Sequence, residues 1–258
     1  MNEPVLLAVA HGSADARSEQ VLDALIARVR SERPGLVAVL AYLGFSDPDL
    51  NSALDSLERQ GFHDVIVVPL LLSSAYHAKV DLPALLKTAA PQYPGLAIRQ
   101  AEVLGPHPLL FDLVRRRLTE SGTDPDASVV LAAVGTSDPA ANAELADVAA
   151  SLGATIGFAS GEPALADVVA DLHRRGARQV AVASYALAPG QLPDRFHDAG
   201  ADVVTEILGA APEVVEVVLY RYDAVVAAGL SDGLAVGRSR ALYRGQSVDI
   251  SDRVASGS

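Results

Sequence analysis

The chain contains no cysteine among its 258 residues. Disulfides and thiolate metal sites are therefore excluded. Long apolar runs are also missing, since none approaches the roughly 20 residues of a membrane-spanning helix. The first residues, Met1-Asn2-Glu3-Pro4, lack the basic flank of a signal peptide. Together these absences predict a cytoplasmic protein that makes no use of a membrane.

Basic residues are scarce. Lys and Arg total 20 against 32 Asp and Glu, a net charge of −12, and lysine occurs only at Lys79 and Lys87. Because nucleic acid requires a basic footprint, we expect no nucleic-acid partner. An acidic chain can still bind a small anion where the local field opposes the net charge. No pattern in the sequence sets the oligomeric state.

Apolar, strand-like runs alternate with helix-like segments throughout the chain. In the first half the predicted strands are 5–10, 37–43, 65–72 and 96–103. The predicted helices there are 18–32, 47–60, 79–90 and 107–120. Such alternation indicates βαβ units that build a parallel sheet.

The second half repeats this scheme. Its predicted strands are 129–134, 154–159, 180–187 and 202–207, and its predicted helices are 140–152, 163–175, 191–199 and 212–227. Short phrases recur as well, since the stretch 61–65 has a counterpart in 176–180. We therefore predict an α/β fold of two similar parallel-sheet lobes with flavodoxin-like topology, produced by internal duplication and facing each other across a cleft.

The duplication is unequal, which predicts a single site. Val134 takes the place of His11, and the stretch 188–192 has no histidine where His77 would recur. We expect an N-terminal lobe, 1–122, that carries the site, and a degenerate C-terminal lobe, 123–228. The tail, 229–258, is rich in Gly, Ser, Asp and Arg and is predicted to be irregular.

Two histidines lie just beyond the ends of apolar runs. His11 follows the run 5–10, and His77 follows the run 65–72 by a few residues. Ligands of parallel sheets bind beyond the carboxyl ends of the strands, so both imidazoles are placed where such a fold keeps its chemistry. A pair of neutral imidazoles suits a divalent metal ion. The alternative is two unrelated loop histidines.

The motifs around these histidines resemble a known family. His11-Gly12-Ser13, followed by Asp15 and Arg17, is one of them, and the window from Pro69 through His77 to Asp81-Leu82-Pro83 is another. Both are similar to sirohydrochlorin chelatases of the CbiX and SirB type in their long two-domain form. The phrase 105–109 after the fourth strand fits the same pattern.

The resemblance implies insertion of a divalent metal, Fe²⁺, Co²⁺ or Ni²⁺, into a tetrapyrrole in sirohaem or cobalamin biosynthesis. The metal is then a substrate, and no organic cofactor is implied. His11 and His77 are the implied metal ligands and catalytic residues. The residues that we expect to bind the substrate are Ser13, Arg17, Tyr76 and Lys79.

One position departs from the family pattern. Relatives carry an acidic residue at the end of the second strand, where this chain has Gly44. Asp47, Asp81 or Glu102 are candidate replacements, and the sequence does not choose among them. The departure favours an alternative function, a non-catalytic metal-binding or tetrapyrrole-binding protein derived from a chelatase.

Other enzyme classes lack their motifs in this chain. Ala10 precedes His11, so the arginine of a histidine phosphatase is missing. The nucleophile elbow of serine hydrolases, the phosphate-binding P-loop and the dinucleotide fingerprint are absent too.

Overall fold

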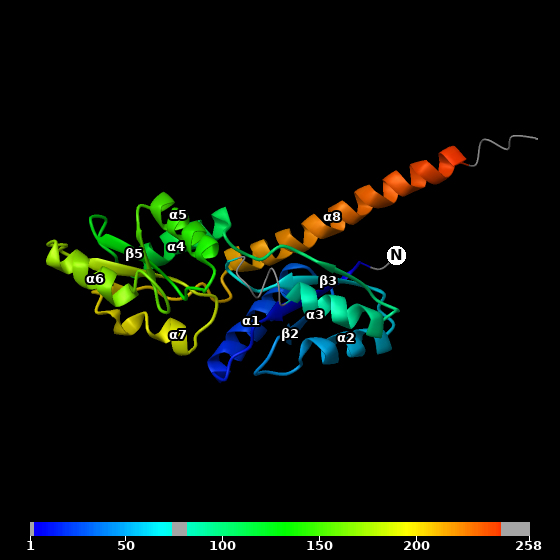
Figure 1. Cartoon of the computed structure of the whole chain (residues 1–258), viewed down its shortest axis with the longest axis horizontal. Helices are drawn as coiled ribbons and strands as arrows, with labels where there is room; N and C mark the ends of the chain where they lie inside the picture. Colours follow the sequence, from blue (N-terminus) through cyan, green and yellow to red (C-terminus); the bar gives the residue numbers. More distant parts are fainter. Residues whose placement is uncertain (1–2, 74–81, 244–258) are drawn as a thin grey trace, which may run out of the picture.

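Two four-stranded parallel sheets, each flanked by helices, form two lobes (Figure 1). The computed structural model describes residues 3–73 and 82–243, with side chains up to residue 229. In the first lobe the strands are β1 (Val5–Ala10), β2 (Ala38–Tyr42), β3 (Asp64–Pro69) and β4 (Ala97–Gln100). Their spatial order is β2-β1-β3-β4, and all six residues of the central strand β1 are buried.

The second lobe has the same strand order. Its strands are β5 (Ser128–Ala133), β6 (Thr155–Phe158), β7 (Val180–Tyr185) and β8 (Val203–Val204). They are arranged β6-β5-β7-β8, which is the order of the first lobe shifted by four strands. The predicted α/β fold of two similar parallel-sheet lobes is therefore confirmed. β8 is shorter than the predicted 202–207.

Helices cover both faces of each sheet. Those of the first lobe are α1 (Ala16–Glu32), α2 (Leu50–Arg59) and α3 (Leu82–Ala89), followed by a 3₁₀ turn at Ala90–Gln92. Those of the second lobe are α5 (Pro139–Ser151), α6 (Leu165–Arg174) and α7 (Gln191–Asp194), followed by a 3₁₀ turn at His197–Ala199. The predicted helix 191–199 is thus two short pieces. Alternate residues of β1 point to opposite faces, where Leu7 packs with α2 and α3 and Leu6 packs with α1.

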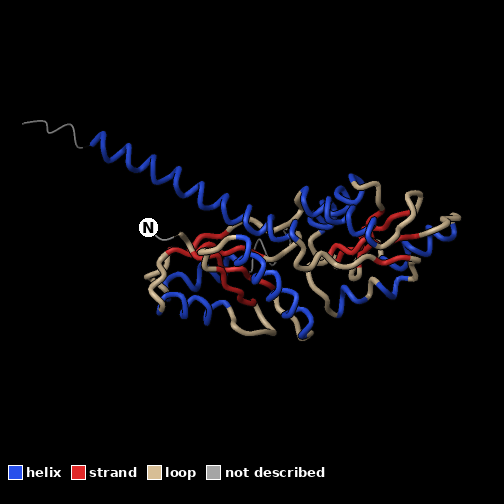
Figure 2. Tube along the Cα trace, turned by 180° about the vertical axis from the view of Figure 1, so that it is seen from behind, coloured by secondary structure: helices blue, strands red, loops and turns tan. Residues whose placement is uncertain are grey.

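The last helix of each half crosses to the other lobe. α4 (Pro108–Glu120) contacts β7 of the second sheet, and α8 (Pro212–Tyr243) contacts β3 and α1 of the first (Figure 2). The two helices also contact each other, and Arg116 of α4 donates two hydrogen bonds to Glu213 of α8, both at 2.8 Å. We propose 1–122 and 123–228 as the duplicated sequence units, each of which lends its last helix to the partner sheet.

The predicted irregular tail is wrong over its first half, because α8 continues to Tyr243. No proline follows Pro212 to interrupt the backbone ladder, and isolated glycine and serine residues lower helix propensity without ending a helix. Residues 244–258 lie outside the described part. Among the described residues no helix, α8 included, is both long and apolar enough to cross a membrane.

Tyr222 tests whether α8 is an integral part of the first lobe. Its side chain is fully buried, and its hydroxyl donates to the carbonyl oxygen of Pro4 at 2.6 Å. Tyr222→Ala should lower the free energy of unfolding by about 3–5 kcal/mol through cavity formation. Tyr222→Phe, which loses only the hydrogen bond, should cost about 1 kcal/mol. Urea denaturation measures both, and an alanine variant of unchanged stability would show that α8 is not docked.

Candidate functional site

A cavity of about 680 Å³ lies between the carboxyl ends of the two sheets. The first lobe contributes its strand ends, and the second lobe contributes the ends of β5 and β7 with the helices that follow them. The lining residues are His11, Leu70, Leu71, Leu72, Ser73, Ala133, Val134, Gly135, Thr136, Ser137, Leu145, Tyr185, Ala186, Leu187, Ala188, Leu192 and Pro193. This is the place in which ligands of open α/β sheets bind.

The chemistry of the cavity wall is mainly apolar. His11 and a few hydroxyl groups are its polar members, and no Asp, Glu, Lys or Arg of the described residues lines it. The acidic side chains of the described residues therefore do not form this wall. Such a wall accommodates a bulky apolar body whose charged groups remain near solvent.

The position of His11 depends on Gly12. Gly12 has a φ of +90°, and a Cβ atom there would lie 1.7 Å from the carbonyl oxygen of Gly44. The amide of Gly44 in turn donates to the carbonyl oxygen of His11 at 3.1 Å. Only glycine allows this approach of the loop after β1 to the loop after β2.

The imidazole of His11 is exposed, and it lies close to Gly12 and Phe45 among the described residues. Its Nδ1 lies 3.2 Å from the carbonyl oxygen of Gly12. Its ring centroid lies 5.9 Å from that of Phe45, with the two planes inclined by 29°. In the tautomer in which Nδ1 donates to the carbonyl, Nε2 is the unprotonated ring nitrogen.

The second lobe repeats the backbone without the histidine. A Cβ atom on Gly135, at φ +87°, would lie 2.1 Å from the carbonyl oxygen of Ser160, and the amide of Ser160 donates to the carbonyl oxygen of Val134 at 2.9 Å. Val134 therefore stands where His11 stands in the first lobe, and it lines the same cavity. Duplication has produced two similar loops, of which only the first presents an imidazole.

Ser13, Asp15 and Arg17 form the first turn after His11. The hydroxyl of Ser13 accepts from the amide of Asp15 at 3.1 Å, and Asp15 caps α1 by accepting from the amide of Arg17 at 2.9 Å. The Arg17 guanidinium also donates to Asp194 of α7 at 2.5 Å. These hydrogen bonds lower the pKa of Asp15 and raise that of Arg17. Arg17 thus bridges the lobes, and binding a substrate carboxylate would require exchange with its present partners.

The other predicted site residues fall outside the described part of the chain. Tyr76, His77 and Lys79 belong to the segment 74–81, as does Asp81. Within the described residues no three His, Asp or Glu side chains come together to hold a metal ion. Of the candidate acids, Glu102 is ion-paired with Arg221 of α8 at 2.7 Å, and Asp47 does not line the cavity.

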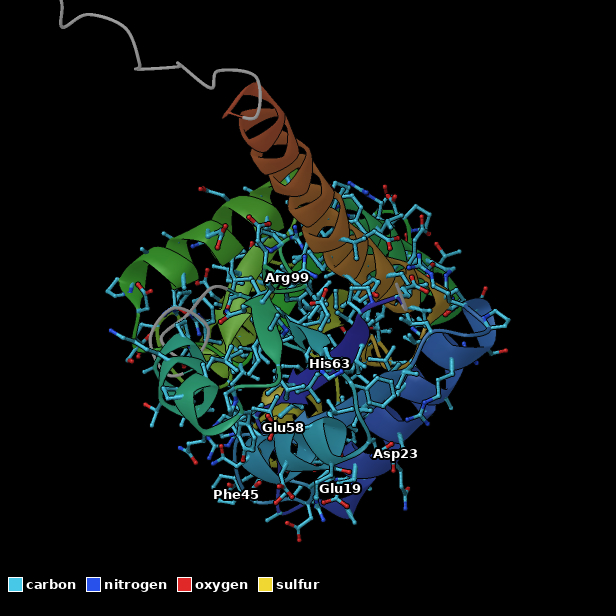
Figure 3. The ribbon with its side chains drawn as sticks, turned by 90° about the vertical axis from the view of Figure 1, so that its right-hand side faces the viewer. Glu19, Asp23, Phe45, Glu58, His63 and Arg99 are labelled. Atoms are coloured by element: carbon cyan, nitrogen blue, oxygen red, sulfur yellow. The ribbon has the colours of Figure 1, made fainter. Side chains whose placement is uncertain are left out.

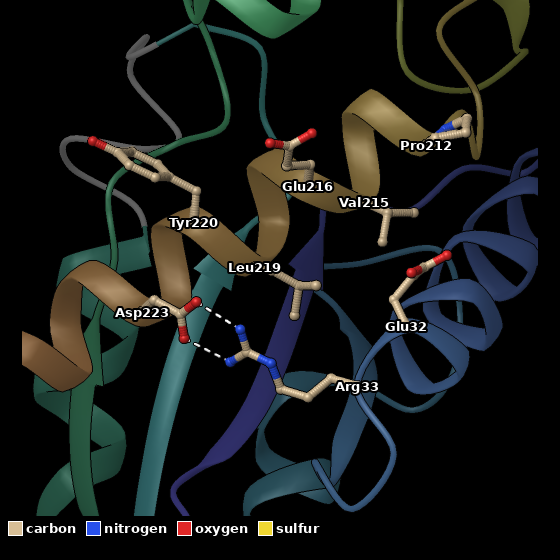
Figure 4. Close-up of a pocket in the computed structure, with 8 residues that line it drawn as sticks. All are labelled: Glu32, Arg33, Pro212, Val215, Glu216, Leu219, Tyr220 and Asp223. Atoms are coloured by element: carbon tan, nitrogen blue, oxygen red, sulfur yellow. Dashed lines mark hydrogen bonds and ion pairs between the residues drawn. The ribbon is translucent and has the colours of Figure 1, made fainter.

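The remaining described histidines lie away from the cavity lining. His63, His173 and His197 are exposed, and Figure 3 shows His63 at the end of the first lobe. His107 caps α4, and burial lowers its pKa. A second hollow, of about 510 Å³, lies between α1 and α8, where Arg33 and Asp223 form an ion pair at 2.6 Å (Figure 4). It does not adjoin the strand ends and is not a candidate site.

Tyr185 is a cavity residue that the sequence pattern did not indicate. It ends β7, its side chain is almost fully buried, and burial raises its pKa. Its hydroxyl has no hydrogen-bond partner among the described residues. A Cβ atom on Gly105 would lie 2.6 Å from this hydroxyl, so glycine there lets Tyr185 reach the first lobe. An aromatic residue at the end of an apolar strand carries no local sign of this role.

Comparison with known proteins relates both halves of the chain to chelatases. The CbiX family model matches residues 5–121. The chain is 27% identical over 207 residues to the sirohydrochlorin cobaltochelatase of Priestia megaterium, covering 75% of this chain and 67% of that protein. It is 28% identical over 203 residues to the sirohydrochlorin ferrochelatase of the same organism, covering 75% and 76%.

Solved structures show the same fold. SirB from Bacillus subtilis, in a structure with Fe³⁺, superposes with a TM-score of 0.75 at 24% identity. The match covers 85% of this chain and 94% of SirB. The fold of this chain is thus shared with that protein.

Replacing Tyr185 with phenylalanine tests the unpaired hydroxyl. A buried donor without a partner destabilises the folded state, so Tyr185→Phe should raise the free energy of unfolding by about 1 kcal/mol. Tyr222→Phe is the matched control, because the hydroxyl of Tyr222 does have a partner and its loss should destabilise. Urea denaturation of the two variants compares them, and a destabilised Tyr185→Phe variant would reveal a hydrogen bond to that hydroxyl.

Proposed function

Because this chain belongs to the sirohydrochlorin chelatase family, we propose that it inserts a divalent metal ion into sirohydrochlorin. The observation that carries the proposal is the placement of His11, at the end of a buried strand and in the wall of the cavity between the lobes. This placement supports the proposal because His11, as the proposed metal ligand, would lie beside the space proposed for the tetrapyrrole.

The cavity supports this substrate in shape and in polarity. The body of a tetrapyrrole is a broad apolar ring system whose carboxylates project from its rim. The apolar lining from both lobes suits the ring system, while the rim remains near solvent and near Arg17. Arg17, Lys79, Ser13 and Tyr76 are proposed to hold the rim, since guanidinium and hydroxyl groups hydrogen-bond carboxylates well.

Insertion exchanges one metal ion for two pyrrole protons. In the tautomer in which Nδ1 of His11 donates to the Gly12 carbonyl, Nε2 is proposed as the atom that binds the metal. His77 is proposed as the second ligand. As the pyrrole nitrogens take over the metal, the released imidazoles are proposed as the bases that accept the two departing protons. Imidazole binds such ions and also releases them, whereas thiolate would hold them more firmly.

The relatives include both cobalt and iron enzymes. We propose Co²⁺ or Fe²⁺ as the metal substrate, with Ni²⁺ as a further candidate, because two imidazoles accept all three and availability decides among them. A cytoplasmic location and the lack of a nucleic-acid partner stay predictions. A metal or tetrapyrrole carrier is the second candidate function, favoured by Gly44 and by the uncharged lining of the described part of the cavity.

His11→Ala should abolish insertion without unfolding the protein, because the side chain is exposed. The expected loss of kcat/KM exceeds about 100-fold, since even the loss of an outer partner of a metal ligand costs roughly 10–100-fold. His63→Ala is the matched control, an exposed histidine whose Nδ1 also lies 3.2 Å from a backbone carbonyl oxygen. The absorbance change of sirohydrochlorin with Co²⁺ measures turnover, and His77→Ala is predicted to behave like His11→Ala.

Three outcomes separate the candidates. Turnover that depends on His11 but not on His63 supports the chelatase. Stoichiometric binding of metal or tetrapyrrole without turnover supports the carrier. Full turnover in His11→Ala would remove this histidine from the mechanism.

Gly44→Glu should restore the acidic group of the relatives. A Cβ atom at Gly44 meets nothing within 4 Å, so the chain has room for the side chain beside His11. Assistance by a general base is worth roughly 10²–10⁴-fold, so kcat should rise more than the affinity for Co²⁺ does. Gly44→Gln, which has the same shape without the charge, is the control. A stable Gly44→Glu variant with unaltered kinetics would mean that another group already accepts the protons.

A further inference from the structure

Phe45 is the most exposed of the large apolar side chains in the described part of the chain, at 76%. It lies in the loop between β2 and α2, at the rim of the first lobe (Figure 3). The buried clusters of the first lobe do not include it, although the neighbouring Leu43 packs against one of them. Its ring therefore adds little to the core.

The backbone of Phe45 is also unusual. Its φ is +64°, and among the described residues no other non-glycine residue has a positive φ. The corresponding loop of the second lobe has Gly161, at φ +132°, after Ser160, just as Phe45 follows Gly44. The duplicated turn thus requires a residue with a positive φ angle, a backbone conformation that glycine adopts readily and phenylalanine does not. The lobe that kept the histidine carries the less favourable residue.

The ring of Phe45 contacts the imidazole of His11. Their centroids lie 5.9 Å apart and their planes are inclined by 29°, within the range of stacked aromatic pairs. Exposure of the ring to solvent and the strained backbone both disfavour phenylalanine at this position. The contact with His11 is the favourable interaction that we identify for its ring. In the second lobe Val134 replaces the histidine, and Gly161 replaces the phenylalanine.

We propose that Phe45 is a positioning residue that holds the His11 imidazole in the orientation in which it binds the metal. The proposal rests on the proposed function, because it gives Phe45 a role only through a metal ligand. Stacking limits rotation of an exposed imidazole, so less ordering is required when the metal binds. The hydrogen bond of Nδ1 to the Gly12 carbonyl fixes the same ring from its edge.

Phe45→Gly and Phe45→Tyr separate positioning from stability. Phe45→Gly removes the ring and the strained backbone together, so its thermal unfolding midpoint should equal or exceed that of the wild type. Its affinity for Co²⁺, without tetrapyrrole, should fall by about twofold to tenfold, the range of aromatic stacking energies. Phe45→Tyr keeps the stacked ring and should restore the wild-type affinity. The d–d absorption of the bound Co²⁺ reports the ligand geometry and should change in Phe45→Gly only.

Tyr220→Leu is the matched control, because it removes an exposed ring that contacts His107 in a tilted arrangement, with the ring centroids 5.2 Å apart. Its Co²⁺ affinity and spectrum should match those of the wild type. Wild-type Co²⁺ binding in Phe45→Gly would overturn the proposal. If the unfolding midpoint of that variant is lowered as well, the role of Phe45 is one in stability. If wild-type Co²⁺ binding is instead insensitive to His11→Ala, the proposed function itself fails.

Discussion

The contact between Gly12 and the Gly44 carbonyl is the constraint on which the site depends. With only a hydrogen atom in place of a side chain, Gly12 allows the loops after β1 and β2 to meet, and the Gly44 amide closes the contact on the His11 carbonyl. This pairing sets His11 at the cavity and Phe45 against its ring. The same pairing recurs at Gly135 and Ser160, so it belongs to the duplicated fold and does not depend on the histidine.

The two lobes share one backbone fold but contribute different side chains to the cavity. The first lobe supplies the imidazole, while the second supplies an apolar wall and the buried Tyr185. The crossing of α4 and α8 and the bridge from Arg17 to Asp194 join the lobes on separate sides. These contacts hold the cavity between the halves in a defined shape, although the proposed metal ligand His11 belongs to the first half alone.

Much of the fold could be predicted from the sequence, because parallel strands buried on both faces read as continuous apolar runs. β1 spans the predicted 5–10, and β5 lies one residue from its prediction. The role of Asp15 as a helix cap also follows from local sequence. The length of α8, the ion pair of Arg17 with Asp194 and the burial of Tyr185 could not be predicted from local sequence. They arise from packing between segments far apart in the chain. The proposed role of Phe45 could not be predicted from the sequence either, since it depends on a left-handed backbone angle and on the contact with the ring of His11.

The location of the bound metal tests the account most directly. Crystals grown with Co²⁺ and measured at the cobalt absorption edge would show the ion as an anomalous difference peak. The account predicts a peak about 2.1 Å from a ring nitrogen of His11, at the wall of the cavity between the lobes. Cobalt bound elsewhere on the protein, with no peak beside His11, would contradict it.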